Sequence, residues 1–526
     1  MKTDGSTYRP SKMLAAVLAL CVLGVGLGLL LTSCGGGQSG RTDPPPIPPS
    51  PLSASDVDEV VHAAVQSVNV PIVVAVTDRL GRILAVFCTE TPCNPTTGMG
   101  NFGTTPDSQN LAVALARTAS FFSNTQAPLS SRTVRFISGI HFPPGVSFTP
   151  NAALYGIENT NRGCSFNTTF VTGKEIPPAT LIDGTSPGLG VITGKADVND
   201  SDPLAVNPGG VPIFKNGTMV GGVGVVAAST DVAEYAAFQG SGGLTGLADG
   251  IGLVVAPPGV VLIDGIALPF VNQTSAPPGI SPGSFTGSYM IGPTGDLPLA
   301  PDGYLVNPSA GPIGGLSQSE VDSIVMNAVA TASVTRAVIR LPLGSRARMV
   351  IAVSDLDGTL LALYRMPDAT VFSIDVAVAK SRNVIYYSTP PAPVDLPGVP
   401  SGTAVTNRTI SFGAQPLFPP GIDGSGPGPF FDLYKQDTAN PCTQGSDTTN
   451  PQNHNGIVFF PGSVPLYRNG VLVGGLGVSG DGVEQDDFVS NGGSAGFEAP
   501  TAIRADQVFI DDVRLPYLKF PRDPTK

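Results

Sequence analysis

Gly462 to Phe488 read GSVPLYRNGVLVGGLGVSGDGVEQDDF. Two apolar runs flank the dipeptide Asn469-Gly470, which is the strongest short-range signal for a β-hairpin. Gly474 and Gly475 interrupt the second run, and glycine inside a strand usually marks a bulge or a close approach of a ligand or another backbone. The stretch therefore predicts a hairpin that could serve as core, as binding surface, or as both.

The same pattern occurs much earlier, because Gly209 to Ala227 read GGVPIFKNGTMVGGVGVVA. The shared string V-P-[IL]-[FY]-[KR]-N-G-x-x-V-G-G-[VL]-G-V is too long to arise readily by chance, and it predicts a duplication. We expect an N-terminal half at residues 52–273, a linker at 274–315 and a C-terminal half at 316–526.

Further matched segments extend the repeat on both sides of the hairpins. Each half opens with a helical apolar stripe, then shows two apolar runs around an Asp/Gly turn, and then a second helical pattern. Long Pro/Gly-rich insertions follow at 125–208 and 390–461. After the organising hairpin come a helical acidic segment and then a strand-like segment, at 261–270 and 508–517. This order predicts the α+β class: two tandem profilin-like domains, each an antiparallel sheet flanked by helices.

Composition narrows the function classes. Hydrophobic residues make up 41% of the 526 residues, which is enough for two or more cores, while 65 Gly and 52 Pro indicate much turn and loop structure. The net charge of -12, with only 28 Lys+Arg, argues against a nucleic-acid partner, because phosphate neutralisation needs clustered basic residues.

The N-terminus carries an export signal. Basic residues precede an apolar run, 13–31, that ends Leu31-Thr32-Ser33-Cys34. This pattern predicts a signal peptide at 1–33, and its end resembles the lipobox of bacterial lipoproteins, which implies cleavage before Cys34 and lipidation of its thiol. An uncleaved transmembrane anchor is the alternative. Either way we expect a Gly/Pro tether at 34–51 and a folded part outside the cytoplasm.

Three segments of the C-terminal half resemble the HbpS/GlcG-type family of haem-binding domains. They are SDLDGTLLALYRM at 354–366, DVAVAKSRNV at 375–384 and the hairpin with its acidic helix at 462–487, and residues 52–250 resemble the family more weakly. The resemblance implies a profilin-like (GlcG-like) α+β domain, often oligomeric, that binds haem or a related tetrapyrrole. Some members of this family promote iron-dependent haem breakdown. The sequence leaves open whether this chain turns haem over.

Haem needs an axial donor, or an apolar slot with cations for its propionates. The candidates are Lys380, Arg382 and Arg117 on the second helix of each half, and His141 and His454 in the insertions. For the three helix residues, the alternative is an ordinary position on the helix surface. For the two histidines, it is a solvated loop position. Lys380 is replaced by Leu115 in the N-terminal half, which favours the C-terminal half as the binding one. No C-x-x-C-H occurs, so covalent c-type haem is excluded, and no metal cluster or nucleotide is expected.

Four cysteines remain beyond the signal peptide and Cys34. In an oxidising compartment Cys88, Cys93, Cys164 and Cys442 could form two disulfides with three connectivities. Cys88 and Cys93 are near enough in sequence for a local bridge. Cys164 and Cys442 occupy matching places in the two insertions, so a bridge between the halves is the favoured hypothesis for that pair.

Two rival functions stay open. Asp355-Leu356-Asp357-Gly358-Thr359 resembles the first motif of haloacid-dehalogenase-type phosphatases, and Gly480-Asp481-Gly482 with Asp486 resembles their metal-binding motif. A hairpin turn and an acidic helix start explain the same strings structurally, which makes the phosphatase a minor alternative. The other rival is a non-enzymatic assembly module built on the duplicated fold.

The favoured hypothesis is a haem-binding or tetrapyrrole-binding lipoprotein of a bacterial cell envelope, periplasmic or at the outer membrane or surface. Its role would lie in haem uptake, storage or degradation. Its expected partners are a small planar ligand, the membrane through the lipid anchor, and further copies of itself.

Overall fold

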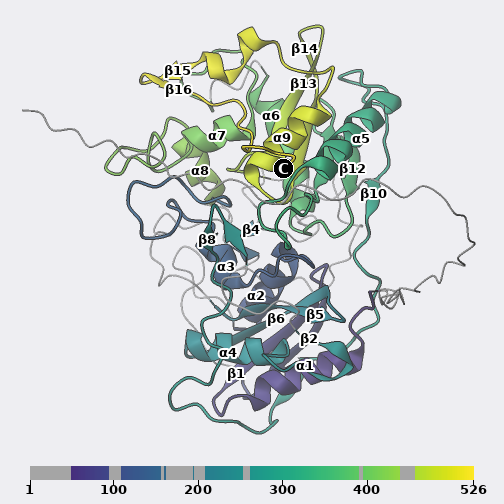
Figure 1. Ribbon diagram of the computed structural model, residues 1–526, viewed down its shortest axis with the longest axis vertical. Helices are drawn as coiled ribbons and strands as arrows, with labels where there is room; N and C mark the ends of the chain where they lie inside the picture. The colour runs from purple at the N-terminus through teal and green to yellow at the C-terminus, as the bar shows by residue number, and fades with distance from the viewer. Residues whose placement is uncertain are drawn as a thin grey trace, which may run out of the picture. The chain divides into compact units, whose positions relative to one another are not determined.

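The computed structural model describes residues 49–93, 108–155, 208–252, 261–389, 395–438 and 456–526, together with two short strands, β3 Asn159–Thr160 and β4 Thr193–Gly194. All of these residues belong to one compact unit, Pro48–Lys526. They form a mixed α+β structure with two five-stranded antiparallel sheets (Figure 1). The predicted α+β class is therefore confirmed, while the predicted signal peptide and most of the predicted tether lie outside the described residues.

The two sheets have the same strand order. The first runs β5-β6-β1-β2-β9, with strands β1 Ile72–Asp78, β2 Ile83–Cys88, β5 Gly210–Lys215, β6 Thr218–Ala227 and β9 Ser288–Ile291. The second runs β13-β14-β11-β12-β10, with strands β10 Gly303–Val306, β11 Val350–Ser354, β12 Leu360–Arg365, β13 Ser463–Arg468 and β14 Val471–Ser479. Neighbours pair antiparallel throughout both sheets.

The organising hairpins are β5-β6 and β13-β14. Their turns place Asn216 and Gly217, and Asn469 and Gly470, at positive φ, as a two-residue hairpin turn requires. The hairpins are therefore confirmed.

Residues 274–315, expected as a linker, supply an edge strand to each sheet. β9 pairs with β2, and its Tyr289 ring lies 4.9 Å from the ring of Phe87. β10 pairs with β12, and its Tyr304 ring lies 5.0 Å from the ring of Tyr364. The sequence concealed both strands because each is short and surrounded by Pro and Gly.

Three long helices accompany each sheet. α1 Ala54–Gln66 and α4 Thr230–Gly240 pack against each other on one side of the first sheet, and α2 Ser108–Phe122 packs on β5, β6 and β1 (Figure 1). The second sheet repeats this arrangement with α5 Gln318–Val334 and α9 Val483–Gly493 together, and with α6 Ser373–Tyr387 against β14, β11 and β13. Ser53 and Ser317 cap α1 and α5 through capping boxes.

The glycines within β6 and β14 admit a helix backbone. A Cβ atom on Gly224 would lie 2.0 Å from Ala112 O of α2, and one on Gly477 would lie 2.0 Å from Ala377 O of α6. Between two such glycines of β6, Val223 points the other way, toward Gly240 of α4. Close approach of another backbone is therefore realised at these glycines, and each hairpin also has a register shift beside its strand glycines, opposite Leu466 and Tyr467 and opposite Ile213 and Phe214.

Two differences from the expected elements have clear causes. Segments 261–270 and 508–517 were expected as single strands, but they form small hairpins, β7 Leu262–Ile263 with β8 Ile266–Ala267 and β15 Phe509–Ile510 with β16 Val513–Arg514. Asp264-Gly265 and Asp511-Asp512 adopt positive φ and turn the chain there.

The insertions also contain short helices that the sequence analysis missed. They are α3 Ser131–Phe136, α7 Asn407–Gly413 and α8 Phe431–Thr438. Ser130 and Thr406 cap the first two, and each receives a hydrogen bond from the N–H of a threonine three residues on.

Short 3₁₀ turns complete the described structure, at Ala248–Gly250, Thr501–Ile503 and Ala505–Gln507. Within the described part of the chain, no helix combines the length and the hydropathy that membrane crossing requires.

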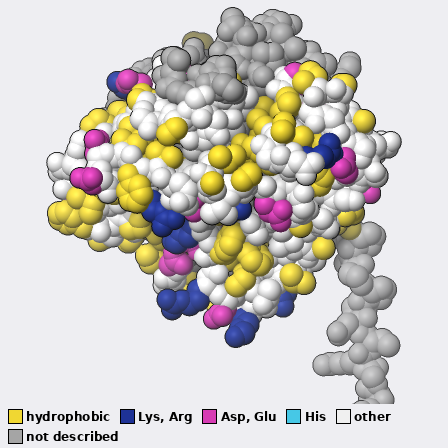
Figure 2. All heavy atoms as spheres, turned by 90° about the horizontal axis from the view of Figure 1, so that it is seen from above, with side chains coloured by type: hydrophobic (Ala, Val, Ile, Leu, Met, Phe, Trp, Pro, Cys, Tyr) yellow, Lys and Arg dark blue, Asp and Glu magenta, His cyan; other side chains and the backbone are white. Residues whose placement is uncertain are grey.

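On the face drawn in Figure 2, basic and acidic side chains lie near one another between groups of hydrophobic side chains.

Candidate functional site

The described halves enclose a cavity of about 570 Å³. This volume lies within the range of pockets that hold small ligands. Its wall combines segments 122–154 and 263–264 of the N-terminal half with residues between 336 and 522 of the C-terminal half. Five phenylalanine rings form much of the apolar wall: Phe122, Phe142, Phe372, Phe412 and Phe460. Phe122 and Phe372 stack across the halves with ring centroids 4.4 Å apart.

Polar side chains gather on another part of the wall. α9 contributes Glu484, Gln485 and Asp486, because Gly482, at φ 136, turns the chain from β14 into this helix beside the cavity. Basic side chains come from α7, from the segment after α5 and from the C-terminal segment: Arg408, Arg336, Lys519 and Arg522.

Lys380 and Asp486 form a buried ion pair at the wall. The Lys380 ammonium donates to Asp486 Oδ2 at 3.0 Å and to Val478 O at 2.8 Å, and it lies 4.5 Å from the centre of the Phe460 ring. Burial raises the pKa of Asp486 to about 7, although Lys380 opposes this rise. Burial likewise lowers the pKa of Lys380 against the attraction of Asp486. The second carboxylate oxygen, Asp486 Oδ1, is buried and has no hydrogen-bond partner among the described residues.

Arg408 makes the second ion pair of this region. Its Nε donates to Asp487, whose carboxylate also accepts from the backbone N–H groups of Gly462 and Lys519. Its Nη2 is buried and finds no acceptor in the described part of the chain. One guanidinium edge is thus held by α9 while another donor remains for a ligand.

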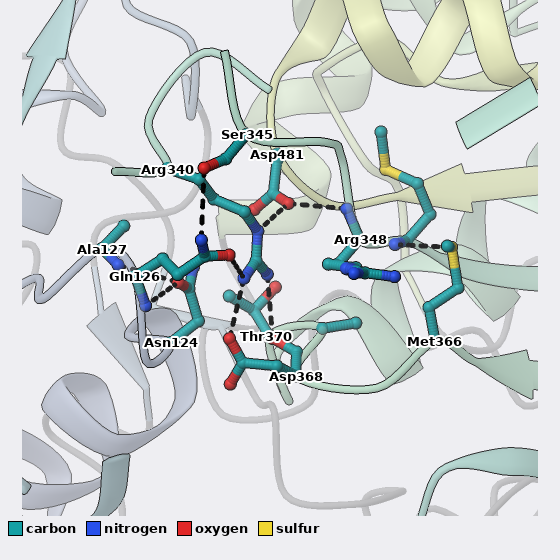
Figure 3. Close-up of polar contacts among 12 residues, drawn as sticks. Asn124, Gln126, Ala127, Arg340, Ser345, Arg348, Met366, Asp368, Thr370 and Asp481 are labelled. Atoms are coloured by element: carbon teal, nitrogen blue, oxygen red, sulfur yellow. Dashed lines mark hydrogen bonds and ion pairs between the residues drawn. The ribbon is translucent and has the colours of Figure 1, made fainter. Parts of the chain in front are cut away.

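A polar cluster near the cavity joins the two halves (Figure 3). The Arg340 guanidinium lies between Asp481 and Asp368, and it donates to Asp368 Oδ2 at 2.7 Å and to Gln126 Oε1 at 3.3 Å. From the N-terminal half, Arg79 also pairs with Asp368 at 2.9 Å. Although burial acts in the opposite direction, the two arginines hold the pKa of Asp368 below its usual value. Hydrogen bonds and ion pairs between the two halves therefore support the cavity wall.

The predicted site residues separate into two groups. Lys380 lies behind the wall residue Asp486, whereas Arg117 and Arg382 do not line the cavity. Their Nε atoms each donate at 2.8 Å to a hairpin-turn carbonyl, Gly81 O and Gly358 O respectively. Both arginines are buried rather than on the helix surface, and burial lowers the pKa of Arg382 to about 9.

His141 is also buried, which differs from a solvated loop position. Its Nδ1 lies 3.0 Å from Thr149 O, and its Nε2 lies 3.4 Å from Asp423 of the other insertion. Its neighbour Phe142 lines the cavity while His141 does not. Cys88 and Cys93 form a disulfide with Cα atoms 5.5 Å apart. Cys34, Cys164, Cys442 and His454 lie outside the described residues.

The phosphatase-like strings have structural partners. The Asp355 carboxylate is buried and accepts from the backbone N–H groups of Ile313, Gly314 and Leu356, while Asp357 accepts from Thr359 N within the turn. Asp481 binds Arg340 and Arg348 N. No group of three or more His, Cys, Asp or Glu side chains that could hold a metal ion occurs among the described residues.

Sequence reasoning missed most of the polar wall. Arg408 is not among the candidates named from the sequence, and Asp486 entered only through the phosphatase resemblance. Arg336 and Gln485 carried no signal, because they meet only through the packing of α9 beside the end of α5. The difference between Lys380 and Leu115, already visible in the sequence, was the signal that pointed toward this region.

Comparisons with known proteins place the C-terminal part. Residues 325–494 match the family described as haem degrading protein HbpS-like, so the C-terminal part carries an HbpS-like domain. Corrinoid adenosyltransferase PduO of Salmonella typhimurium is 28% identical over 152 residues, which are 29% of this chain and 33% of that protein. The Citrobacter freundii PduO is 29% identical over 138 residues, 26% of this chain and 29% of that protein. The chain thus spans about a third of the length of the curated relatives it matches.

Three solved structures are similar over parts of the chain. A PduOC:haem complex is 22% identical, with TM-score 0.23, and the match covers 35% of this chain and 97% of that one. The Klebsiella pneumoniae protein ORFY is 20% identical, with TM-score 0.22, covering 34% and 88%. A variant of Streptomyces reticuli HbpS is 16% identical, with TM-score 0.21, covering 38% and 95%.

Proposed function

We propose that this chain binds a haem-like tetrapyrrole in the cavity between its halves. The observation that carries the proposal is the composition of the cavity wall, whose C-terminal part lies largely within the HbpS-like match at 325–494. Phenylalanine rings suit the faces of a planar macrocycle. Basic side chains on the same wall suit carboxylates, since charge-assisted hydrogen bonds to carboxylate are the strong ones.

The residues present fit the carboxylate end of such a ligand. Arg408 Nη2 is a buried donor that no described residue satisfies, and a propionate would satisfy it. Lys519 and Arg522 line the same cavity and would attract the second carboxylate. Bound haem would supply redox-active iron. The lining residues that the structure describes include no His, Cys, Met or Tyr, and the predicted ligand His454 lies outside those residues.

The proposal extends to the organisation of the chain. We infer a tandem duplication of an HbpS-like domain, supported by the identical strand order of the two sheets and by the matched roles of Arg117 and Arg382. Because the cavity takes its wall from both halves, one ligand per chain is expected. The lipobox-like residues Leu31-Thr32-Ser33-Cys34 support a lipid-anchored protein of the bacterial envelope.

Haemin titration of the purified protein tests the proposal, with absorbance in the Soret region as the signal. We expect saturation near one equivalent per chain. Ala153→Trp, which fills the cavity, should weaken binding at least about tenfold, because the added ring and the ligand compete for the same space. Ala330→Trp, on the exposed side of α5 and away from the wall, is the matched control and should bind normally.

The absence of any spectral change at micromolar haemin and with related tetrapyrroles would overturn the proposal. Concentration-dependent self-assembly in the same samples would then support the assembly module. Saturation unaffected by Ala153→Trp would place the ligand elsewhere on the chain.

A further inference from the structure

Several polar atoms of the cavity wall are buried without a partner among the described residues. Two are acceptors on consecutive residues of α9, Gln485 Oε1 and Asp486 Oδ1, and two are guanidinium donors, Arg336 Nε and Arg408 Nη2. Folded proteins satisfy most of their buried polar groups, because each unmet donor or acceptor is costly. A wall with both kinds of unmet group is complementary to a ligand that both donates and accepts hydrogen bonds.

The surrounding contacts fix these atoms in place. Asp486 Oδ2 is held by Lys380, so Oδ1 is the oxygen of that carboxylate left unpaired among the described residues. Gln485 Nε2 donates to Arg336 O at 3.2 Å, so Oε1 is the atom of that amide that no described residue pairs with. Arg408 Nε is held by Asp487. The unmet atoms therefore cannot readily find protein partners by rotating their side chains, since doing so would break these contacts.

The chemistry of the two acceptors separates tetrapyrroles from one another. In haem all four ring nitrogens bind the iron, so the macrocycle offers no N–H donor to a carboxylate or an amide oxygen. An open-chain tetrapyrrole such as biliverdin carries lactam and pyrrole N–H groups that no iron occupies, and it keeps two carboxylates for the guanidinium donors. Only the open-chain ligand meets both the donors and the acceptors of this wall.

We propose that the cavity preferentially binds an open-chain tetrapyrrole dicarboxylate, with its N–H groups directed to Asp486 and Gln485 and its carboxylates directed to Arg408 and Arg336. This inference rests on the proposed tetrapyrrole function and deepens it. It makes Asp486 a specificity-determining residue that distinguishes open-chain from iron-bearing tetrapyrroles.

Parallel titrations of the full chain with biliverdin and haemin at about pH 8.5 test the proposal, with absorbance and induced circular dichroism as readouts. At this pH Asp486, whose pKa burial raises to about 7, is ionised and accepts hydrogen bonds. Biliverdin should bind at least about tenfold more tightly than haemin, as one additional hydrogen bond to a charged group would give. Asp486→Asn should weaken biliverdin binding about tenfold or more and haemin binding less than about twofold, since the amide that replaces Oδ1 donates where the ligand also donates.

A folding control keeps the test decisive. The double variant Lys380→Leu/Asp486→Ala installs the apolar residues that occupy the equivalent positions of the N-terminal half, and it should retain the fold while losing the preference for biliverdin. Haemin binding equal to or tighter than biliverdin binding would overturn the inference and leave the proposed function standing. An undiminished preference in both variants would also overturn it, whereas no binding of either pigment would overturn the inference and the proposed function together.

Discussion

One matching position of the fold holds a charged pair of side chains in the C-terminal half and an apolar pair in the N-terminal half. In the C-terminal half a Cβ atom on Gly462 would lie 2.6 Å from Asp486 Cβ and 2.7 Å from Lys380 Nζ, and in the N-terminal half Gly209 faces Ala233 and Leu115. The ion pair made by the next residue of the helix differs less, because Arg408 pairs with Asp487 where Arg132 pairs with Glu234. The two halves thus share the contacts that build the fold. The Lys380–Asp486 pair belongs to the C-terminal half, whose helix α9 lines the cavity.

This comparison shows what a buried ion pair is retained for. The apolar pair Leu115 and Ala233 demonstrates that the fold is compatible with no charges at this position. Replacing a buried ion pair by apolar residues is often neutral or stabilising. The Lys380–Asp486 pair is therefore better explained by the ligand site proposed above than by stability.

The largest expected effect tests the contacts that the halves have in common. Gly224→Ala and Gly477→Ala should each destabilise the protein by more than about 3 kcal/mol, because a rigid helix carbonyl lies 2.0 Å from the new Cβ atom. Urea unfolding followed by circular dichroism measures the loss. Gly292→Ala and Gly426→Ala, which meet nothing within 4 Å, are the controls. A normal midpoint for Gly477→Ala would contradict the packing described for α6.

The second-largest effect is expected from removing the Lys380–Asp486 pair, by which the two halves differ. Asp486→Ala alone should cost about 3–5 kcal/mol, because it leaves the Lys380 ammonium buried without its counter-charge. Lys380→Leu/Asp486→Ala should stay within about 1 kcal/mol of the wild type, as the N-terminal half suggests. Free energies of unfolding in urea give both values. Equal losses in the single and the double variant would show that the pair itself stabilises the fold.

The pH dependence of stability sharpens the same comparison. The Asp486 carboxyl has an ordinary pKa of 3.8 when unfolded and a pKa of about 7 when folded, so the folded protein binds more protons between these values. Its contribution is fully present below about pH 4 and is lost as the pH rises through about 7. Relative to the double variant, the wild type should lose about 2–4 kcal/mol over this range. Parallel pH dependences in the two proteins would refute the shifted pKa.

The smallest effect concerns an ion pair that occurs at matching places in both halves but is buried to different extents. Lys215 pairs with Asp56 at 2.6 Å with side chains 13% and 0% exposed, while Arg468 pairs with Glu320 at 2.6 Å with side chains 35% and 34% exposed. Lys215→Met should therefore cost about 1–3 kcal/mol, because it strands a buried carboxylate. Arg468→Met should cost about 1 kcal/mol or less, as exposed pairs usually do. Thermal unfolding at low and high salt compares the two, and a larger loss for Arg468→Met would reverse the assignment.

Sequence patterns predicted the frame of the fold well. The Asn-Gly turns, the helical stripes and the repeated V-G-G motif predicted both hairpins and all six long helices, because these signals are local. The edge strands β9 and β10 escaped, since short strands among Pro and Gly have no periodicity to detect. The cavity escaped for a different reason. Arg336, Arg408 and Gln485 belong to segments far apart in the chain, and only the tertiary packing within the C-terminal half brings them together. Arg117 and Arg382 were predicted as candidate binding residues on the second helix of each half, yet their hydrogen bonds to Gly81 O and Gly358 O depend on how each helix packs beside a distant turn.

The connecting segment decides where this chain can be divided. β9 covers the outer edge of β2 in the first sheet and β10 covers the outer edge of β12 in the second. A fragment boundary within 292–302 would leave each fragment its own edge strand. A boundary on either side would strip one sheet and expose a row of unpaired backbone groups, which invites strand pairing between molecules and aggregation. For expression of separate fragments, the cut therefore belongs between Ile291 and Gly303.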